Sequence, residues 1–426
     1  MKKEDEKYGT YLRILEEELI LAMGCTEPIA LAYGAATARE ALAALPEKVL
    51  VQVSGSIIKN VKSVIVPNTG HLKGIPAAVA AGIIAGQPRR KLEVIASVTG
   101  QEIQKMREFL ETAKIQVEHI DYGHVFDLVI TVYHGESYAK VRIVDFHTNL
   151  VLIEKDGEIL LEKELEDSEN KEERADRSLL DMESIWDFAM TVDIEDVRTV
   201  LERQIKCNSA IAEEGLRGEY GACMGKTLLD VYGDDIRNRA KAKAAAGSDA
   251  RMNGCELPVV INSGSGNQGI TASVPVIEYA KELNSGEEKL FRALVLSNLA
   301  TIHQKTGIGT LSAFCGVVSA GAGAGAGIAY LKGGGYKEVI HTIVNALAIV
   351  SGIFCDGAKA SCAAKIAASV DAAILGYEMY CQGRQFVGGD GIVMKGVEAT
   401  IRSVGYIGRE GMKETNETII KMMLEE

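Results

Sequence analysis

The chain has 426 residues, a length that suggests two or three domains. Hydrophobic residues make up 47% and charged residues 25%, which is the composition of an ordinary globular protein. A formal net charge of −13, dispersed basic residues and 5% aromatics exclude a phosphate-binding surface, so we expect no nucleic-acid partner. No signal-peptide core follows Met1–Lys7, and no uncharged apolar run is long enough to span a membrane. We therefore expect a cytoplasmic protein with no membrane partner. In a reducing compartment, metal binding or catalysis explains the eight cysteines better than disulfides do.

Two helices are predicted at the amino terminus. Apolar residues recur at helical spacing over Tyr11–Met23, and this helix is expected to stop at Gly24. Thr26-Glu27-Pro28 then supplies an N-cap residue, an early acid and a first-turn proline. These residues predict a second helix that continues to about Leu45.

The segment from Lys48 to about Leu161 has a different pattern. Short β-branched runs separated by turn residues predict strands. The expected strands are Val49–Val53, Val61–Val66, Leu92–Val98, Leu128–Tyr133, Tyr138–Val144 and Val151–Ile153, and the expected helices are Pro76–Ala85 and Glu102–Ala113.

The second half is expected to be mostly helical. The dense charge run Glu162–Arg177 predicts a solvated connection, and glycine-rich joints interrupt the helices from Ile185 onward. The sequence therefore predicts an α+β fold, in which a glycine/alanine-rich helical catalytic domain carries an inserted β-rich α/β domain. The predicted division is 1–46 for the amino-terminal helices that join the catalytic domain, 47–178 for the insert and 179–426 for the helical domain.

Three cysteines lie in glycine-rich stretches of this helical half. Cys315, Cys355 and Cys362 would supply the thiolates of an iron–sulfur cluster whose fourth iron is left for a substrate. Asp356-Gly357 breaks the chain, so we expect Cys355 at a helix N-terminus and Cys362 within that helix. On spacing alone, three buried structural cysteines are the better explanation, because a C-x6-C pair is not a strong signature.

Cys25 has a different setting. In GCTEP it falls between one helix and the N-terminus of the next, where a thiolate is stabilised and its pKa is lowered. It is therefore a candidate nucleophile or general base, with a buried cap residue as the alternative.

Two turns could bind an anion. Gly264–Gly269 matches G-x-G-x-x-G, but the βαβ context of a dinucleotide site is missing, so a nest of N–H groups that grips a carboxylate fits better. A plain turn is the alternative reading. The second is Val66–Gly70, which precedes a helix and alone is no more than a turn with an N-cap.

Taken together, these segments resemble the iron–sulfur-dependent L-cysteine desulfidases, which belong with the α-chain of iron–sulfur-dependent L-serine dehydratases. The resemblance rests on GCTEP, VPNTGHLKGIPAA, GSGNQG, LSAFCG and CDGAKASC in this order, and runs from the first helix to about Met394. Several motifs in the same order are far more specific than any one of them. They favour a cluster over three structural cysteines.

The resemblance implies a 4Fe–4S cluster on Cys315, Cys355 and Cys362, with one iron free to bind substrate. It implies that Cys25 is the base that removes the α-proton, and that no pyridoxal phosphate is needed. It also implies a small amino-acid substrate and a homo-oligomer, expected to be a dimer. The implied substrate-binding residues are Asn68, Thr69, Gly70, Gly264, Ser265, Gly266, Asn267 and Gln268.

The expected reaction is β-elimination of L-cysteine to sulfide, ammonia and pyruvate. L-Serine is the close alternative, because its hydroxyl could leave in the same way. A non-catalytic iron–sulfur redox sensor is the alternative of another class. That alternative leaves GCTEP and GSGNQG without a role, since a sensor needs no small-molecule pocket.

Overall fold

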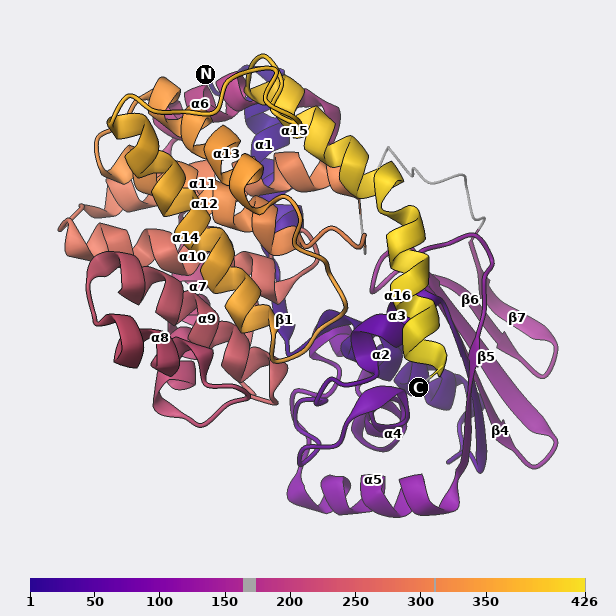
Figure 1. Cartoon of the computed structure of the whole chain (residues 1–426). Helices are drawn as coiled ribbons and strands as arrows, with labels where there is room; N and C mark the ends of the chain where they lie inside the picture. The colour runs from indigo at the N-terminus through magenta and orange to yellow at the C-terminus, as the bar shows by residue number, and fades with distance from the viewer. Residues whose placement is uncertain (164–173, 310–311, 426) are drawn as a thin grey trace.

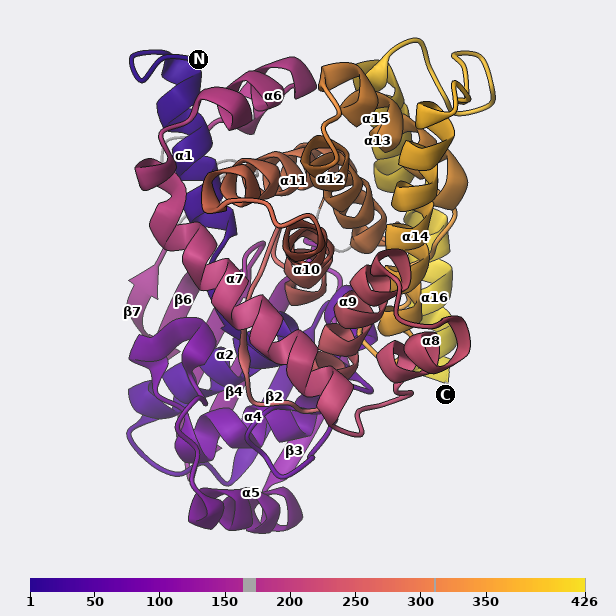
Figure 2. The same cartoon turned by 90° about the vertical axis from the view of Figure 1, so that its left-hand side faces the viewer.

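The structure is a computed structural model that describes residues 1–163, 174–309 and 312–425. It divides into a helical part and a part built on a sheet (Figures 1 and 2). This arrangement confirms the predicted α+β class. How the chain divides into independent domains stays a prediction.

The sheet-containing part lies between residues 26 and 162. Its six-stranded sheet has the order β3-β2-β4-β5-β6-β7, in which β2 and β3 are parallel and the other neighbours antiparallel. The strands are β2 (Lys48–Val53), β3 (Lys114–His119), β4 (Asp127–His134), β5 (Ser137–Val144), β6 (Leu150–Lys155) and β7 (Glu158–Glu162); the helices are α2 (Thr26–Leu42), α3 (Gly55–Val61), α4 (Gly74–Ala85) and α5 (Gly100–Thr112), with a 3-10 turn η1 at Pro88–Glu93.

The helix α2 is the main cover of this sheet. It contacts β4, β5 and β6 as well as α4, and fourteen of its seventeen residues are buried. Alanines make up much of its length, and Gly34 lets a helix turn approach Leu128 and Ile130 of the sheet. The hydrophobic core of this part lies between α2, α4 and the sheet. Its packing therefore depends on small side chains on the helices and branched side chains on the strands.

The helical part contains α1 (Glu6–Glu18), α6 (Met182–Thr191), α7 (Ile194–Arg217), α8 (Met224–Tyr232), α9 (Ile236–Met252), α10 (Gly266–Glu282), α11 (Glu287–Ile308), α12 (Gly316–Leu331), α13 (Tyr336–Val350), α14 (Cys362–Cys381), α15 (Val397–Tyr406) and α16 (Lys413–Glu425), with short turns at Arg177–Leu179 (η2) and Ile407–Gly411 (η3). The centre is α12, which contacts α10, α11, α13 and α14. A Cβ at Gly323 would lie 2.2 Å from Thr301 Oγ1, so glycine is needed for α11 to pack this closely.

Contacts near both ends of the chain help to join the parts. The short strand β1 (Leu21–Met23) pairs antiparallel with β8 (Pro258–Val260). The carboxy-terminal helix α16 leaves the helical part and lies against α3 (Figure 1). No helix in the described part of the chain is both long and apolar enough to cross a membrane.

Several sequence predictions need correction. Residues 21–23 form a strand instead of the end of the first helix. Val61–Val66 is not a strand, because Ile57, Ile58 and Val61 are buried at helical spacing in α3. Leu92–Val98 lies in and after η1, where its apolar residues pack as irregular chain.

Two strands of the six-stranded sheet were not predicted. In β3, Lys114, Gln116 and Glu118 alternate with apolar residues at the edge of the sheet, and the strand β7 at the other edge is mostly exposed. The remaining predicted strands and helices are present to within a few residues. Most of the predicted connection Glu162–Arg177 lies outside the described residues.

Candidate functional site

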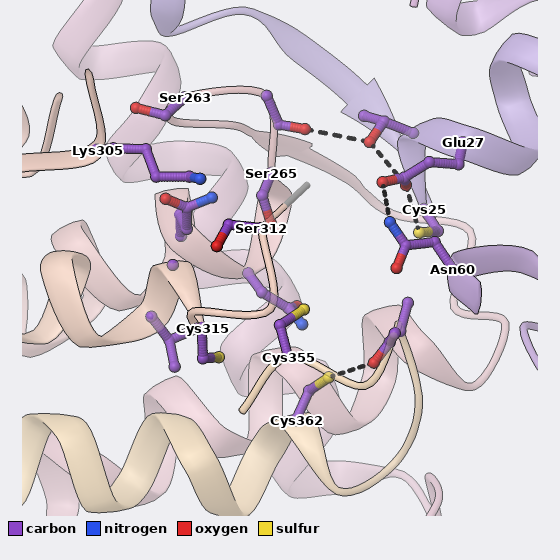
Figure 3. Close-up of a pocket in the computed structure, with 18 of the residues that line it drawn as sticks. Cys25, Glu27, Asn60, Ser263, Ser265, Lys305, Ser312, Cys315, Cys355 and Cys362 are labelled. Carbon is purple, nitrogen blue, oxygen red and sulfur yellow. Dashed lines mark hydrogen bonds between the residues drawn. The ribbon is translucent and has the colours of Figure 1, made fainter. Parts of the chain in front are cut away.

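A cavity of about 130 Å³ lies where the two parts meet (Figure 3). This volume is well below the roughly 300–1,000 Å³ of pockets for drug-sized ligands, so the site suits a small molecule. Eight of the site residues predicted from sequence line it, although more than two hundred residues separate the first from the last. They are Cys25, Gly264, Ser265, Asn267, Gln268, Cys315, Cys355 and Cys362.

The strand pair β1–β8 brings Cys25 to the cavity. Met23 pairs with Pro258, and the GCTEP turn follows directly. Gly24 has φ +59°, and a Cβ there would lie 2.7 Å from Pro67 Cγ, so this turn requires glycine. The hydroxyl of Thr26 lies 3.1 Å from both the Gly264 carbonyl oxygen and Glu27 Oε2, and it can donate to either. The GCTEP turn and the glycine loop are thereby held together.

One wall of the cavity is a closed hydrogen-bond network, which we call the amino-terminal wall (Cys25, Glu27 and Asn60). The Cys25 thiol donates to Glu27 Oε2 at 3.0 Å, and Asn60 Nδ2 donates to Glu27 Oε1 at 2.9 Å (Figure 3). Cys25 is 3% exposed and Glu27 7% exposed. Both carboxylate oxygens of a buried acid are thus satisfied.

The charge state of this wall differs from the sequence prediction. Burial and the adjacent Glu27 carboxylate raise the pKa of Cys25 well above its usual value, so Cys25 is a neutral thiol in the free protein. Burial alone would raise the pKa of Glu27, but the charge of His147, the hydrogen bond from Cys25 and the charge of Arg251 together lower it. Burial also lowers the pKa of His147, so this side chain carries little charge near neutral pH. The partners that keep Glu27 ionised there are therefore Cys25 and Arg251. The prediction of a lowered pKa for Cys25 is wrong, because it takes Glu27 only as part of a helix start. The Glu27 carboxylate lies next to the thiol and raises its pKa.

The opposite wall is built on the first turn of α10 and the end of α9; we call it the glycine-loop wall (Arg251, Ser265, Asn267 and Gln268). Arg251 is 3% exposed and its Nη1 donates to Asn267 Oδ1 at 3.1 Å. Gln268 is 5% exposed and packs over Gly316, where a Cβ would lie 2.6 Å from its side-chain carbon Cδ. Arg251 Nε and Gln268 Oε1 are enclosed and have no hydrogen-bond partner in the structure.

A buried amide network holds the strand that leads into this loop. Gln204 and Asn298 exchange hydrogen bonds of 3.0 and 2.8 Å, and Asn262 Nδ2 donates to Asn298 Oδ1 at 3.0 Å. Asn262 in turn bridges Ser265 through the backbone. All three amide side chains are fully or nearly fully buried, so the network fixes the loop from below.

The three cysteines form the third side of the cavity (Figure 3). Cys315 precedes α12, and its segment pairs with that of Cys355 through backbone hydrogen bonds Cys315 N to Ile353 O and Cys355 N to Ala313 O. Cys362 is the first residue of α14. The prediction that Cys355 begins a helix was wrong, because Cys355–Ser361 has no regular helix and the N-terminus of α14 falls at Cys362.

The charges around these thiols suit an anionic group. A hydrogen bond from Cys315 and the positive charges of Lys59 and Lys365 lower the pKa of Cys355 to about 5. Burial lowers the pKa of Lys305, which also lines the cavity, to about 8, and the neighbouring thiols oppose that shift. A cysteine donor set beside buried lysines therefore fits an iron–sulfur cluster.

Among the described residues, no group of three or more His, Cys, Asp or Glu side chains is spaced to hold one metal ion. The ligands of a four-iron cluster bind separate irons and need not meet at one point. The fit therefore rests on the donor set and the surrounding charges, and the ligand assignment stays a prediction.

The turn at Asn68, Thr69 and Gly70 does not line this cavity. Asn68 Nδ2 donates to the Ile95 carbonyl oxygen, Thr69 Oγ1 donates to Val66 O, and Gly70 O accepts from Arg107. Its neighbour Pro67 packs against Gly24, so the turn supports the GCTEP segment from behind. Gly266 likewise does not line the cavity, since it lies against Arg251.

Sequence reasoning did not identify several polar residues that line the cavity, among them Glu27, Asn60, His147, Arg251 and Lys305. Glu27 lies inside the GCTEP motif, which was a usable signal. The others sit outside every quoted motif, and only the packing of distant segments brings them to the cavity.

Comparison with known proteins gives a consistent family. The profile of the serine dehydratase alpha chain family matches residues 89–421. A UPF0597 protein of Desulfitobacterium hafniense (strain Y51) is 62% identical over 424 residues, covering 100% of this chain and 98% of that protein. UPF0597 proteins of Lachnoclostridium phytofermentans (52% identical; 98% of this chain, 100% of that protein) and Treponema denticola (44% identical; 100% of both) are also similar. The chain belongs to the serine dehydratase alpha chain family.

Proposed function

We propose that this protein is an iron–sulfur-dependent L-cysteine desulfidase, which eliminates sulfide from L-cysteine to give pyruvate and ammonia. Family membership implies a lyase-type enzyme, and the serine dehydratase alpha chain family is generally iron–sulfur dependent. The observation that carries the proposal is that Cys25, the glycine loop and three cysteines line one small cavity.

In this proposal Cys315, Cys355 and Cys362 hold the cluster, and Lys59, Lys305 and Lys365 balance its charge. When bound, a cluster with one iron free of protein thiolate supplies a Lewis acid for the departing β-substituent. The residues of the glycine loop that line the cavity (Gly264, Ser265, Asn267 and Gln268) bind the substrate.

The proton chemistry is assigned to the amino-terminal wall. Cys25 is a neutral thiol, so it must first pass its proton along the 3.0 Å hydrogen bond to Glu27 Oε2. Because the pKa of Cys25 is raised and that of Glu27 is lowered, this transfer is uphill and adds to the barrier of the reaction. The resulting thiolate then takes the α-proton of the substrate. Loss of the α-proton and of the β carbon–sulfur bond leaves aminoacrylate, which water hydrolyses to pyruvate and ammonia. Glu27 is thereby part of the base, because it stores the proton that Cys25 gives up.

Elimination from L-serine is the second candidate, and the name of the family that the chain belongs to favours it. The decisive experiment is an anaerobic reconstitution with iron and sulfide, followed by assays of sulfide and pyruvate from L-cysteine and of pyruvate from L-serine. We expect a higher kcat/KM for L-cysteine. A higher kcat/KM for L-serine would make the protein a serine dehydratase, and no pyruvate from either, with the cluster bound, would contradict both.

A further inference from the structure

No described acid lies within ion-pair distance of Arg251, although its charge helps to keep Glu27 ionised. The guanidinium is 3% exposed and makes one side-chain hydrogen bond, from Nη1 to Asn267 Oδ1. Its Nε is enclosed without a partner, and no described acid forms an ion pair with it; Glu27 is near enough to be affected by the charge but lies beyond ion-pair distance. Burial of an unpaired charge is costly, and native proteins rarely leave such a group unsatisfied. The site is therefore incomplete until an anion enters the cavity.

The N-terminus of α10 provides a second set of donors beside this guanidinium. Ser265 is the N-cap residue, but its side chain does not cap the helix. A Cβ at Gly266 would lie 2.3 Å from Arg251 Nε, so the guanidinium rests directly on the first turn of α10. Free backbone N–H groups at a helix N-terminus favour a carboxylate. Arg251 and three residues at the start of α10 (Ser265, Asn267 and Gln268) thus line the same cavity.

We propose that Arg251 and the uncapped N-terminus of α10 bind the α-carboxylate of the substrate. A planar guanidinium can match a carboxylate with two parallel hydrogen bonds, and it adds a positive charge that a loop of neutral groups lacks. This inference rests on the proposed function in taking the substrate to be an amino acid. It restricts the substrates to molecules with a free, ionised carboxylate and excludes esters, amides and peptides extended at that end.

The acids of the cavity agree with this orientation. Glu27 and Asp145 also line the cavity, and Glu27 belongs to the opposite wall. A free amino acid carries one charge of each sign, so its ammonium group would find acids once its carboxylate is held by Arg251. A substrate with a blocked carboxyl group would leave the Arg251 charge buried without a partner, which is the larger penalty.

The test uses the anaerobically reconstituted holoenzyme and two unreactive probes. L-Alanine has no leaving group, and L-alaninamide has the same skeleton with a neutral amide in place of the carboxylate. Calorimetric titration should show L-alanine binding at least about tenfold more tightly, the effect of one charge-assisted pair. Equal affinities for the two probes would overturn the proposal.

Variants locate the effect. Arg251→Gln should remove the preference for L-alanine while the visible absorbance of the cluster stays, and Arg402→Gln, an exposed arginine on α15, is the matched control that should keep it. Gly266→Ala keeps the charge but displaces the guanidinium, so it should weaken L-alanine binding in the same direction. If Arg251→Gln does not fold, Gly266→Ala and the two probes still decide.

Two further outcomes separate this inference from the proposed function. A variant Arg251→Gln that loses iron but keeps the preference would overturn the inference, because Arg251 would then serve the cluster. A holoenzyme that prefers L-alanine through Arg251 yet releases no pyruvate from L-cysteine or L-serine would support the inference while contradicting the proposed function.

Discussion

The two walls of the cavity differ in how far their polar groups are satisfied. On the amino-terminal wall, Glu27 accepts hydrogen bonds at both oxygens, so the Cys25–Glu27 pair is set before any ligand arrives. On the glycine-loop wall, Arg251 and Gln268 each keep an enclosed polar atom without a partner. A group that must transfer a proton benefits from a fixed partner, whereas a group that must bind a ligand needs a hydrogen-bonding position that is still unoccupied. The contrast divides the cavity into a proton-transfer side and a binding side.

Removal of the thiol should give the largest effect. Cys25→Ser leaves a hydroxyl that is far less acidic, so kcat for elimination should fall by ~10²–10⁴-fold, the usual cost of losing a general base. The cluster should remain, because Cys25 lies outside the proposed ligand set. Iron content and visible absorbance beside turnover are the measurements.

Cys381→Ser, which changes an exposed cysteine, is the control for this variant. The three variants Cys315→Ser, Cys355→Ser and Cys362→Ser should lose iron as well as activity. A Cys25→Ser protein that lost iron would make Cys25 a ligand, and one with full activity would return it to a structural role.

Glu27→Gln should have the next largest effect. Glutamine cannot store the proton of Cys25, so kcat should fall by about 10²-fold. Loss of the carboxylate charge also lowers the pKa of Cys25, because Glu27 raises it in the wild type. Site-resolved alkylation across a pH series should therefore show Cys25 reacting at lower pH in Glu27→Gln. Glu16→Gln, on the exposed face of α1, is the control and should change neither property. Unchanged alkylation in Glu27→Gln would show that Glu27 does not control the pKa of Cys25.

The amide network under the glycine-loop wall predicts a loss of stability. Asn298→Ala leaves the buried Gln204 amide unpaired, at a cost of about 1–3 kcal/mol, whereas Asn262 Nδ2 keeps its bond to the backbone carbonyl oxygen of residue 298. Urea unfolding of the apoprotein should show the loss, and Gln104→Ala on the surface of α5 is the control. Wild-type stability in Asn298→Ala would mean that the loop wall is held elsewhere.

The contrast between the walls also predicts a pH dependence. The folded pKa of Glu27 lies below its usual value of 4.5, so its ionised form stabilises the folded state. That contribution is complete above pH 4.5 and disappears as the pH falls through the folded-state pKa. The stability difference between wild type and Glu27→Gln, measured by urea unfolding, should therefore be constant from pH 7 to 5 and shrink below. A difference that disappears above pH 5 would show that the pKa is not lowered.

The smallest effect on substrate binding is expected behind the amino-terminal wall. Thr69→Val removes the hydrogen bond to Val66 O, which should cost about 1 kcal/mol of stability. Because Thr69 does not line the cavity, KM should stay as in the wild type. A large rise in KM with unchanged stability would return this turn to the substrate site.

The sequence predicted the parts of this molecule that depend on local pattern. Branched residues marked β2, β4, β5 and β6, and the alanine-rich run marked α2. It did not predict β3, because only Ile115 and Val117 are apolar in this short edge strand, and their alternation with polar residues is too brief to stand out. The short strand β1 was also missed, because its apolar residues continue the spacing of the helix before it.

For the site, resemblance accounted for Cys25, the glycine loop and the three cysteines, which all line the cavity. Arg251 could not be identified in this way, because nothing in its local sequence indicates that its guanidinium is buried without an acid. The turn at Asn68–Gly70 shows the reverse, since its motif contributes to the resemblance while its side chains bond to the carbonyl oxygens of Ile95 and Val66. Motifs thus identified segments better than they identified the roles of individual side chains.

The pairing of β1 with β8 has a consequence for synthesis of the chain. Leu21 pairs with Val260, so the site cannot close until a segment more than two hundred residues downstream has been made. At ~5–20 residues per second, Cys25 waits roughly 10–50 s after its own synthesis before its partner strand exists. During that interval nothing on the β8 side shields the thiol that the finished protein keeps 3% exposed. An oxidant present during translation should therefore modify Cys25 far more readily than the same oxidant added to the folded protein.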